Sequence, residues 1–155
     1  MNAQTHLTAR CVLTCHDSER MSKPLSILSW LCRLTAAGIL LQTLYFKFSG
    51  AEESVYIFSK LGLEPWGRLG IGLAELVTAI LLLLPGTVAI GAALAAGLML
   101  GAIASHLTRL GIVVRDDGGL LFGLAWIMFV CAGVTGFLHR RQLLTLTPAF
   151  LRFPL

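Results

Sequence analysis

Charged side chains are scarce in this sequence. Asp, Glu, Lys and Arg make up 13% of its 155 residues, whereas a typical soluble domain contains about 25%. Apolar residues make up 56% before the 16 glycines are counted. A soluble domain of this size buries only about 70% of the surface that its unfolded chain exposes, so it could not hide so much apolar surface. The composition excludes a soluble domain and a disordered chain, and it indicates an integral membrane protein.

Cysteine motifs and cofactor motifs are also missing. The four cysteines are too few for a secreted disulfide scaffold. Cys11 and Cys15 lack the Cys-x-x-Cys spacing, and even with His16 they have no nearby fourth ligand for zinc, so we expect no metal site. Cys32 and Cys131 lie in apolar segments, where we expect packing thiols without a disulfide. No motif for a covalently bound cofactor occurs, and no basic stripe with interleaved aromatics suggests nucleic acid.

Four apolar stretches are long enough to cross a bilayer core of about 30 Å, which takes about 20 helical residues. They cover residues 25–46, 69–84, 87–107 and 119–138, and the second begins near Trp66. Pro85 and Gly86 alone separate the second stretch from the third, which predicts a tight antiparallel hairpin. None shows the strict alternation of a barrel strand. The sequence therefore predicts an all-α integral membrane four-helix bundle that forms one domain over residues 25–138.

The distribution of basic residues predicts the orientation. One side of the membrane would carry seven of them: Arg10, Arg20, Lys23, Arg33, Arg140, Arg141 and Arg152. The other side would carry five: Lys47, Lys60, Arg68, Arg109 and Arg115. By the positive-inside rule, both termini lie in the cytoplasm. We expect a multi-pass protein of a bacterial inner membrane.

The two ends of the chain differ in character from the apolar spans. Residues 1–24 are polar and lack the apolar core of a signal peptide. Two interpretations remain open: a disordered N-terminal tail, or a chain whose true start is Met21 rather than Met1. Residues 139–155 are expected to form a C-terminal tail.

The first outer loop is predicted to contain a short amphipathic helix over residues 50–61. Ser49 and Glu52 have the spacing of a capping box, apolar side chains including Phe58 follow at helical spacing, and Gly62 is a typical helix stop. The helix is either an anchor on the membrane surface or a lid over a pocket.

Polar side chains are costly inside a span, at about 3 kcal/mol each on insertion scales, and they usually face the bundle interior. Helix direction and a rise of 1.5 Å per residue bring four of them to the outer leaflet: Lys47 and His106 near the outer face, and Gln42 and Glu75 deeper, at about the same depth. Asp116 and Asp117 border the same side, and Arg33 lies apart near the inner face. The cluster is either structural, holding helices together, or a polar pocket in which Glu75 and His106 exchange protons or hold a ligand.

The third span contains closely spaced small residues. Gly97 and Gly101 have small-xxx-small spacing, which commonly lets a neighbouring backbone approach. We expect this face to pack within the chain rather than against a second copy.

Four motifs in order resemble the DoxX family of small four-helix bacterial membrane proteins. They are Tyr45-Phe46-Lys47-Phe48-Ser49-Gly50 at the end of the first span, Gly62-Leu63-Glu64-Pro65, Gly70-Ile-Gly-Leu-Ala-Glu75, and the late histidine His106. The resemblance covers about residues 25–138. Relatives include subunits of a thiosulfate:quinone oxidoreductase and partners of oxidative-stress enzymes, which implies membrane redox chemistry. The chain departs from redox-active relatives because it has no Cys-x-x-Cys on the outer side, which argues against thiol–disulfide exchange.

The leading hypothesis is an accessory or quinone-proximal subunit of a membrane redox system, rather than an enzyme on its own. Glu75 and His106 would line an outer-leaflet pocket with Lys47 as the counter-charge and Gln42 nearby. The resemblance implies a quinone as ligand and a membrane or periplasmic redox enzyme as partner, and a homo-oligomer is compatible with it. Two alternatives remain: a small-molecule or lipid binding or transport protein, and a structural assembly factor without chemistry of its own.

Overall fold

The computed structural model describes residues 22–142, which are all helix and connecting loop. The helices are α2 (Lys23–Ser49), α3 (Glu52–Leu61), α4 (Trp66–Leu83), α5 (Val88–Ser105), the π-helix η1 (His106–Leu110) and α6 (Leu120–Leu138). Helices α2, α4, α6, and α5 continued by η1, are long and apolar enough to cross a membrane. The predicted all-α four-helix bundle is confirmed, and the predictions for residues 1–21 and 143–155 lie outside the described residues.

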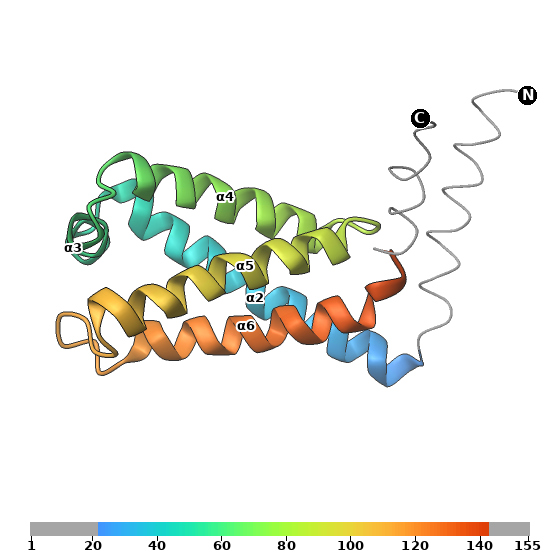
Figure 1. Cartoon of the computed structure of the whole chain (residues 1–155). Coiled ribbons are helices and arrows are strands. Elements are labelled where there is room, and N and C mark those ends of the chain that lie inside the picture. The colour runs from blue at the N-terminus through green and yellow to red at the C-terminus, as the bar shows by residue number, and fades with distance from the viewer. Residues whose placement is uncertain (1–21, 143–155) are drawn as a thin grey trace, which may run out of the picture.

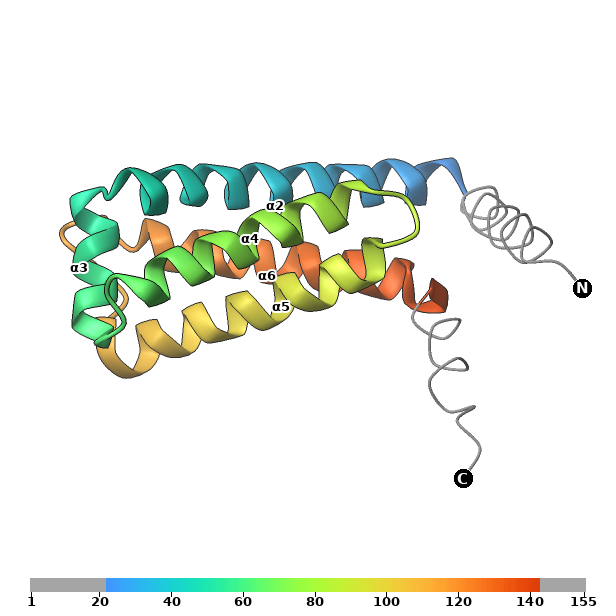
Figure 2. The same cartoon turned by 90° about the horizontal axis from the view of Figure 1, so that it is seen from above.

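The four long helices form a ring in which each packs against two others. Helix α2 contacts α4 and α6, and α5 contacts the same two helices. Short α3 lies across one end of the bundle, here called the α3 end (Figure 1). The α4–α5 hairpin lies at the opposite end, here called the hairpin end, together with the start of α2 and the end of α6 (Figure 2).

Glycines in the left-handed conformation end the two helices that meet at the α3 end. Gly50 has φ 69° and follows α2, and the N–H of Ala51 donates to the carbonyl of Phe46 at 3.1 Å. Gly62 has φ 74° and ends α3, as predicted. The predicted capping box is wrong: Ser49 belongs to α2, and its hydroxyl donates to Phe46 O at 3.4 Å. Consequently α3 begins at Glu52, two residues later than expected, because Gly50 is needed to end α2.

The α4–α5 hairpin is tight because Gly91 has no side chain. A Cβ atom on Gly91 would lie 2.7 Å from the backbone nitrogen of Leu82, closer than van der Waals contact allows. The sequence predicted that Gly97 and Gly101 let a neighbouring backbone of the same chain approach closely. This prediction is wrong, since a Cβ atom on either glycine would meet nothing within 4 Å. The close helix approach in α5 therefore occurs one and a half turns earlier than the sequence pattern suggested.

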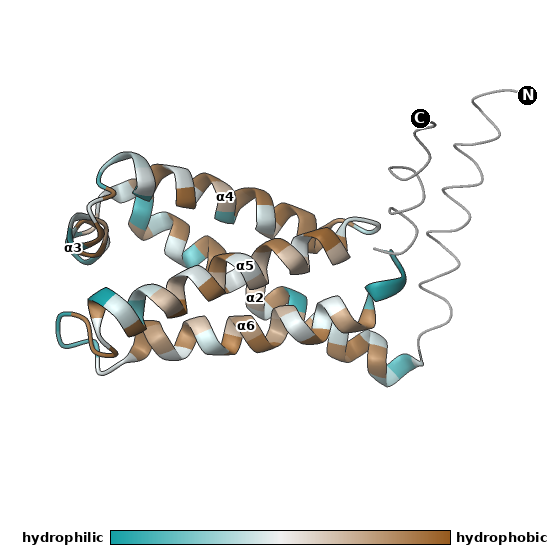
Figure 3. Cartoon of the chain, in the orientation of Figure 1, coloured by the Kyte–Doolittle hydropathy of each residue, from teal (hydrophilic) through white to brown (hydrophobic). Residues whose placement is uncertain are grey.

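The hairpin half of the bundle has a dense core of small residues. Four alanines, one from each long helix, are almost fully buried there: Ala36, Ala79, Ala92 and Ala132. Leu82 and Met128 fill the remaining space and are fully buried. Most residues along the four long helices are apolar, with a few polar ones among them, and polar residues are more frequent towards the ends of the bundle (Figure 3). This distribution suits a hydrocarbon surrounding with polar groups at both interfaces.

Candidate polar pocket at the α3 end

A cavity of about 860 Å³ occupies the α3 half of the bundle. It is lined by residues of all four long helices, α3 and the α5–α6 loop, and most of its lining is hydrocarbon. The polar side chains in the lining include the four that the sequence predicted to converge: Gln42, Lys47, Glu75 and His106. The structure thus brings these four residues together around one cavity.

Lys47 and Glu75 form an ion pair between α2 and α4 inside this cavity. The Lys47 Nζ atom lies 2.9 Å from each carboxylate oxygen. The side chains are only 13% and 5% exposed, so the pair is shielded from water. A buried carboxylate needs such a partner, because an uncompensated charge in this environment is costly.

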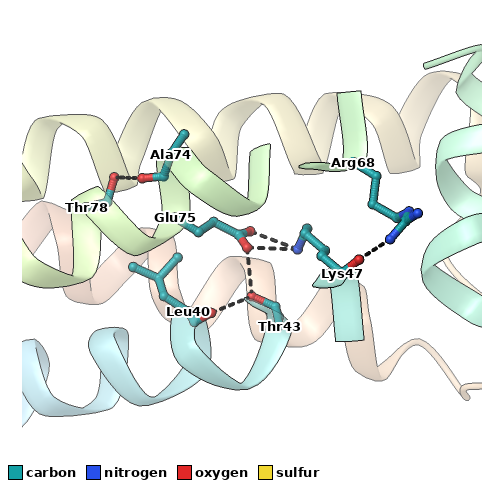
Figure 4. A network of polar contacts seen from close by, with 7 residues as sticks. All are labelled: Leu40, Thr43, Lys47, Arg68, Ala74, Glu75 and Thr78. Carbon is teal, nitrogen blue, oxygen red and sulfur yellow. Dashed lines mark hydrogen bonds and ion pairs between the residues drawn. The ribbon is translucent and has the colours of Figure 1, made fainter. Parts of the chain in front are cut away.

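Thr43 is a third member of this group that the sequence interpretation missed. Its hydroxyl lies 3.2 Å from Glu75 Oε2 and 3.0 Å from the carbonyl of Leu40, and it can donate its hydrogen to either (Figure 4). Thr43 precedes Lys47 by one helical turn, so the two side chains share a face of α2. This i, i+4 spacing was the available signal.

Arg68 fixes the backbone beside the ion pair. Its guanidinium donates to the carbonyl of Lys47 near the C-terminal end of α2 (Figure 4). The same group is held by Glu64, whose carboxylate accepts at 2.8 and 3.0 Å from Nε. A cation at a helix C-terminus satisfies a free carbonyl and complements the helix dipole. The start of α4 therefore holds the end of α2 and helps to position Lys47.

His106 lies where α5 changes into the π-helix η1. Its Nδ1 atom lies 2.8 Å from the carbonyl oxygen of Gly111. Because a carbonyl only accepts hydrogen bonds, Nδ1 must carry the hydrogen, and in the neutral ring Nε2 remains an acceptor. The ring also packs edge-on against Phe122, with 5.6 Å between ring centroids. The His106 ring is thus held in one orientation within the cavity wall.

Asp117 organises the loop that borders the cavity. Its Oδ1 accepts from the N–H groups of Val114 at 2.8 Å and Gly119 at 2.9 Å, and its Oδ2 accepts from Leu121 at 3.0 Å. Partial desolvation opposes ionisation, but these three hydrogen bonds lower the pKa of Asp117 below its usual value. The carboxylate therefore caps the start of α6 in its charged form. Asp116 is exposed beside it.

Helix α3 forms one wall of the cavity. Ser54, Ile57, Phe58 and Leu61 all line it, and Phe58 is only 7% exposed. The helix is held to the α5–α6 loop by an ion pair of 3.2 Å between Glu52 and Arg115. Of the two interpretations of this helix, the contacts favour a cover over the cavity.

Arg33 lies at the hairpin end, apart from the cavity, as the sequence suggested. It is 4% exposed, and it donates from Nε to the carbonyl of Leu82 at 2.6 Å and from a terminal nitrogen to Leu83 at 2.9 Å. Arg33 thus binds the end of α4, just as Arg68 binds the end of α2. The antiparallel α2–α4 pair is joined by an arginine at each end.

The His, Cys, Asp and Glu side chains of residues 22–142 do not suggest a metal site. No group of three or more His, Cys, Asp or Glu side chains is placed there to hold a metal ion. Cys32 on α2 and Cys131 on α6 are free cysteines. The arrangement around the cavity is instead suited to binding an apolar molecule that has a polar end.

Comparison with known proteins identifies the family. A model described as the DoxX-like family matches residues 30–133, about two thirds of the chain. The chain belongs to the DoxX-like family. No curated protein and no solved structure matches it. The matched region includes every residue that lines the cavity, so the cavity lies within the DoxX-like part of this membrane protein.

Proposed function

We propose that this DoxX-like protein binds a lipophilic molecule of the quinone class in the cavity at the α3 end. It would act as an accessory subunit of a redox system in a bacterial inner membrane, with the α3 end on the outer side. The single observation that carries the proposal is the cavity itself, a large hydrocarbon-lined space with a buried polar group at one side. A purely structural polar cluster needs no such space around it.

The size and lining of the cavity suit a lipophilic ligand. Small-molecule sites are commonly about 300–1,000 Å³ in volume and mostly apolar, with a few polar groups that fix orientation. The volume of about 860 Å³ falls in this range. The hydrocarbon lining would contact a ring and the first part of a tail, and the buried polar residues would contact the head group.

The polar residues offer both a donor and acceptors to a head group. The Lys47 ammonium has three hydrogens and two carboxylate contacts, so one hydrogen remains for a ligand carbonyl. His106 offers Nε2 as an acceptor for a ligand hydroxyl, because its Nδ1 is used by Gly111. A quinone presents carbonyls in its oxidised form and hydroxyls in its reduced form. The same pocket can therefore hydrogen-bond to both forms.

The electrostatics favour an uncharged head group. Lys47 and Glu75 neutralise each other at 2.9 Å. An anionic head, such as a phosphate, would compete with Glu75 for Lys47 and leave a carboxylate unpaired in a buried place, which costs several kcal/mol. Because the Lys47–Glu75 pair carries no net charge, it favours a quinone as the ligand. An anionic lipid is the second candidate ligand.

The core beneath the cavity supports binding rather than transport through one copy. Leu82 and Met128 are fully buried, and they belong to the alanine-rich core that packs the hairpin half of the described bundle. A carrier function would require an oligomer or a partner.

The test is native mass spectrometry of the full chain released from its membrane in lipid nanodiscs, with its lipophilic extract analysed alongside. A stoichiometric quinone, retained by the wild type and lost from Lys47→Met/Glu75→Leu, supports the proposal. A stoichiometric phospholipid favours the lipid-binding alternative. Protein that carries only bulk lipid overturns ligand binding and leaves the structural interpretation of the cluster.

A further inference from the structure

We propose that the cavity is filled sideways from the bilayer, through the gap between α4 and α5 near their α3 ends. This gap, here called the α4–α5 window, is bordered by Ile71 on α4 and by Leu94, Gly97 and Gly101 on α5. The proposal rests on the proposed function for the identity of the ligand, but the route itself depends only on the shape of the protein. The occupant is an uncharged lipophilic molecule already dissolved in the membrane.

Helices α4 and α5 are in close contact at one end only. At the hairpin, the backbone of Gly91 lies so near Leu82 that a Cβ atom on the glycine would be 2.7 Å from the leucine nitrogen. Figure 2 shows the two helices converging at the hairpin and separating towards α3.

The border of the window belongs both to the cavity and to the outer surface. Ile71 and Leu94 line the cavity and are 37% and 45% exposed. Gly97 and Gly101 also line the cavity and are exposed. They follow Leu94 at helical spacing on the lipid-exposed side of α5, so they border the mouth of the window on its membrane side. The cavity therefore continues between the helices to the membrane-facing surface.

The two glycines leave the membrane-side mouth of this window free of side chains. A leucine or isoleucine at either position would project its side chain into the open space beside α5. Without side chains at the mouth, a lipophilic head group would enter between the helices towards Glu75, which lies on the buried face of α4. The glycine pair that resembles a helix-packing motif thus has another role here.

Entry from water is less direct because α3 covers that end. Phe58 of α3 is buried and lines the cavity. Lys60 on the same helix donates to the carbonyl of Leu110 at 3.5 Å, and Glu52 pairs with Arg115 at 3.2 Å. A lipophilic molecule would have to leave the membrane and displace these contacts. The lateral route requires neither.

A rival lateral route lies on the opposite side, between α2 and α6. Gln42 and Phe46 on α2 and Leu121 and Leu124 on α6 line the cavity there. All four side chains are large, so this side is more obstructed than the α4–α5 window. The rival route can be tested directly, since a larger side chain at Gln42 would obstruct it further.

The experiment measures access to the cavity without assuming a particular ligand. The full chain in lipid nanodiscs is exposed to a photoreactive diazirine hydrocarbon dissolved in the bilayer, and labelled residues are located by peptide mass spectrometry. Label on Glu75 reports entry, and label on Val77, which is exposed on the outside of the same helix, serves as the internal reference. The variants are Gly97→Leu, Gly101→Leu, Gln42→Trp and the matched control Gly38→Leu.

Gly38 is a fair control because it is exposed on α2, it is absent from the cavity lining, and a Cβ atom there also meets nothing within 4 Å. Leucine favours helix over glycine, so these glycine substitutions are expected to fold. We expect Glu75 label in the wild type and in Gly38→Leu, and its loss in Gly97→Leu and Gly101→Leu, with Val77 label unchanged.

Three results would overturn the route: no Glu75 label in the wild type, Glu75 label that survives both glycine substitutions, or Glu75 label that is lost only in Gln42→Trp.

The same proteins are then titrated with a short-chain quinone. Quinone binding that fails while hydrocarbon labelling behaves as expected rejects the proposed function and leaves the route standing.

Discussion

Lys47 at the end of α2 and Glu75 in the middle of α4 form a buried ion pair at 2.9 Å. The pair joins two helices and also lines the cavity. It could therefore stabilise the bundle, bind a ligand, or do both. These roles respond differently to substitution, because stability depends on balanced charge whereas binding depends on the particular donor and acceptor.

Glu75→Leu is expected to lower the free energy of unfolding by about 3–5 kcal/mol, the usual cost when one partner of a buried pair is removed. Glu75→Gln keeps an acceptor for Lys47 and Thr43, so a smaller loss is expected. Thermal unfolding in mild detergent measures both. Equal stability of Glu75→Leu and the wild type would contradict a structural role of the pair, and normal quinone binding by Glu75→Leu would contradict the pocket.

The double variant Lys47→Met/Glu75→Leu separates the two roles. Replacing both charges with apolar side chains of similar size leaves no unpaired charge, so much of the stability lost in Glu75→Leu should return. Quinone binding should not return, because the head-group donor is absent. If the double variant binds quinone as the wild type does, the ion pair has no part in recognition.

Arg33→Met should destabilise the protein without affecting the cavity. The substitution leaves the carbonyls of Leu82 and Leu83 without their donor, and a buried group that loses its partner costs about 1–3 kcal/mol. Arg33→Lys retains a charge, but its single ammonium nitrogen cannot donate to both carbonyls as the planar guanidinium does. We therefore expect an intermediate loss of stability. Unfolding curves measure the effect. A change in quinone affinity of the folded Arg33→Met protein would show that the two ends of the bundle are coupled.

Asp117 should make the stability of the α5–α6 loop depend on acid pH. Its pKa is lowered on folding, so its stabilisation is fully present above the unfolded value near 3.9. The stabilisation is lost as the pH falls through the lower folded value. Asp117→Ala should cost about 1 kcal/mol, as removal of a helix cap does, and should flatten this acid dependence. Hydrogen exchange of the N–H groups of Gly119 and Leu121 at several pH values measures it.

The bundle was predictable because its main determinants are local. Apolar length fixes the spans, and Pro85 with Gly86 fixes the hairpin between α4 and α5. The depth of Glu75 and His106 followed from helix direction and rise alone. These arguments need only position along a helix, which the sequence supplies.

The errors arose where a residue had two possible roles that only packing could decide. Ser49 matches a cap for α3, but Gly50 is required to end α2, so the serine stays within α2. Gly97 and Gly101 match a packing motif, but the α4–α5 hairpin brings the helices together at Gly91 instead. Thr43 and Arg68 were missed as parts of the site because their roles depend on a neighbouring helix.

The orientation of the bundle is a prediction that the charge count makes with a small margin. The structure places the start of α2 and the end of α6 at the hairpin end (Figure 1), so one labelled position at each end decides the matter. In a variant without the native cysteines Cys11, Cys15, Cys32 and Cys131, a single substitution is introduced: Asp116→Cys in the α5–α6 loop, or Arg141→Cys beyond α6.

A membrane-impermeant maleimide added to intact bacterial cells should label Asp116→Cys and should label Arg141→Cys only after permeabilisation. The physical reason is that basic residues are retained on the cytoplasmic side during insertion, and the sequence predicts seven of them on the side of the two termini against five on the other side. The opposite labelling pattern would place the cavity at the cytoplasmic leaflet. A redox partner would then have to be sought in the cytoplasm, while the hydrocarbon lining and the α4–α5 window would still connect the cavity to the bilayer.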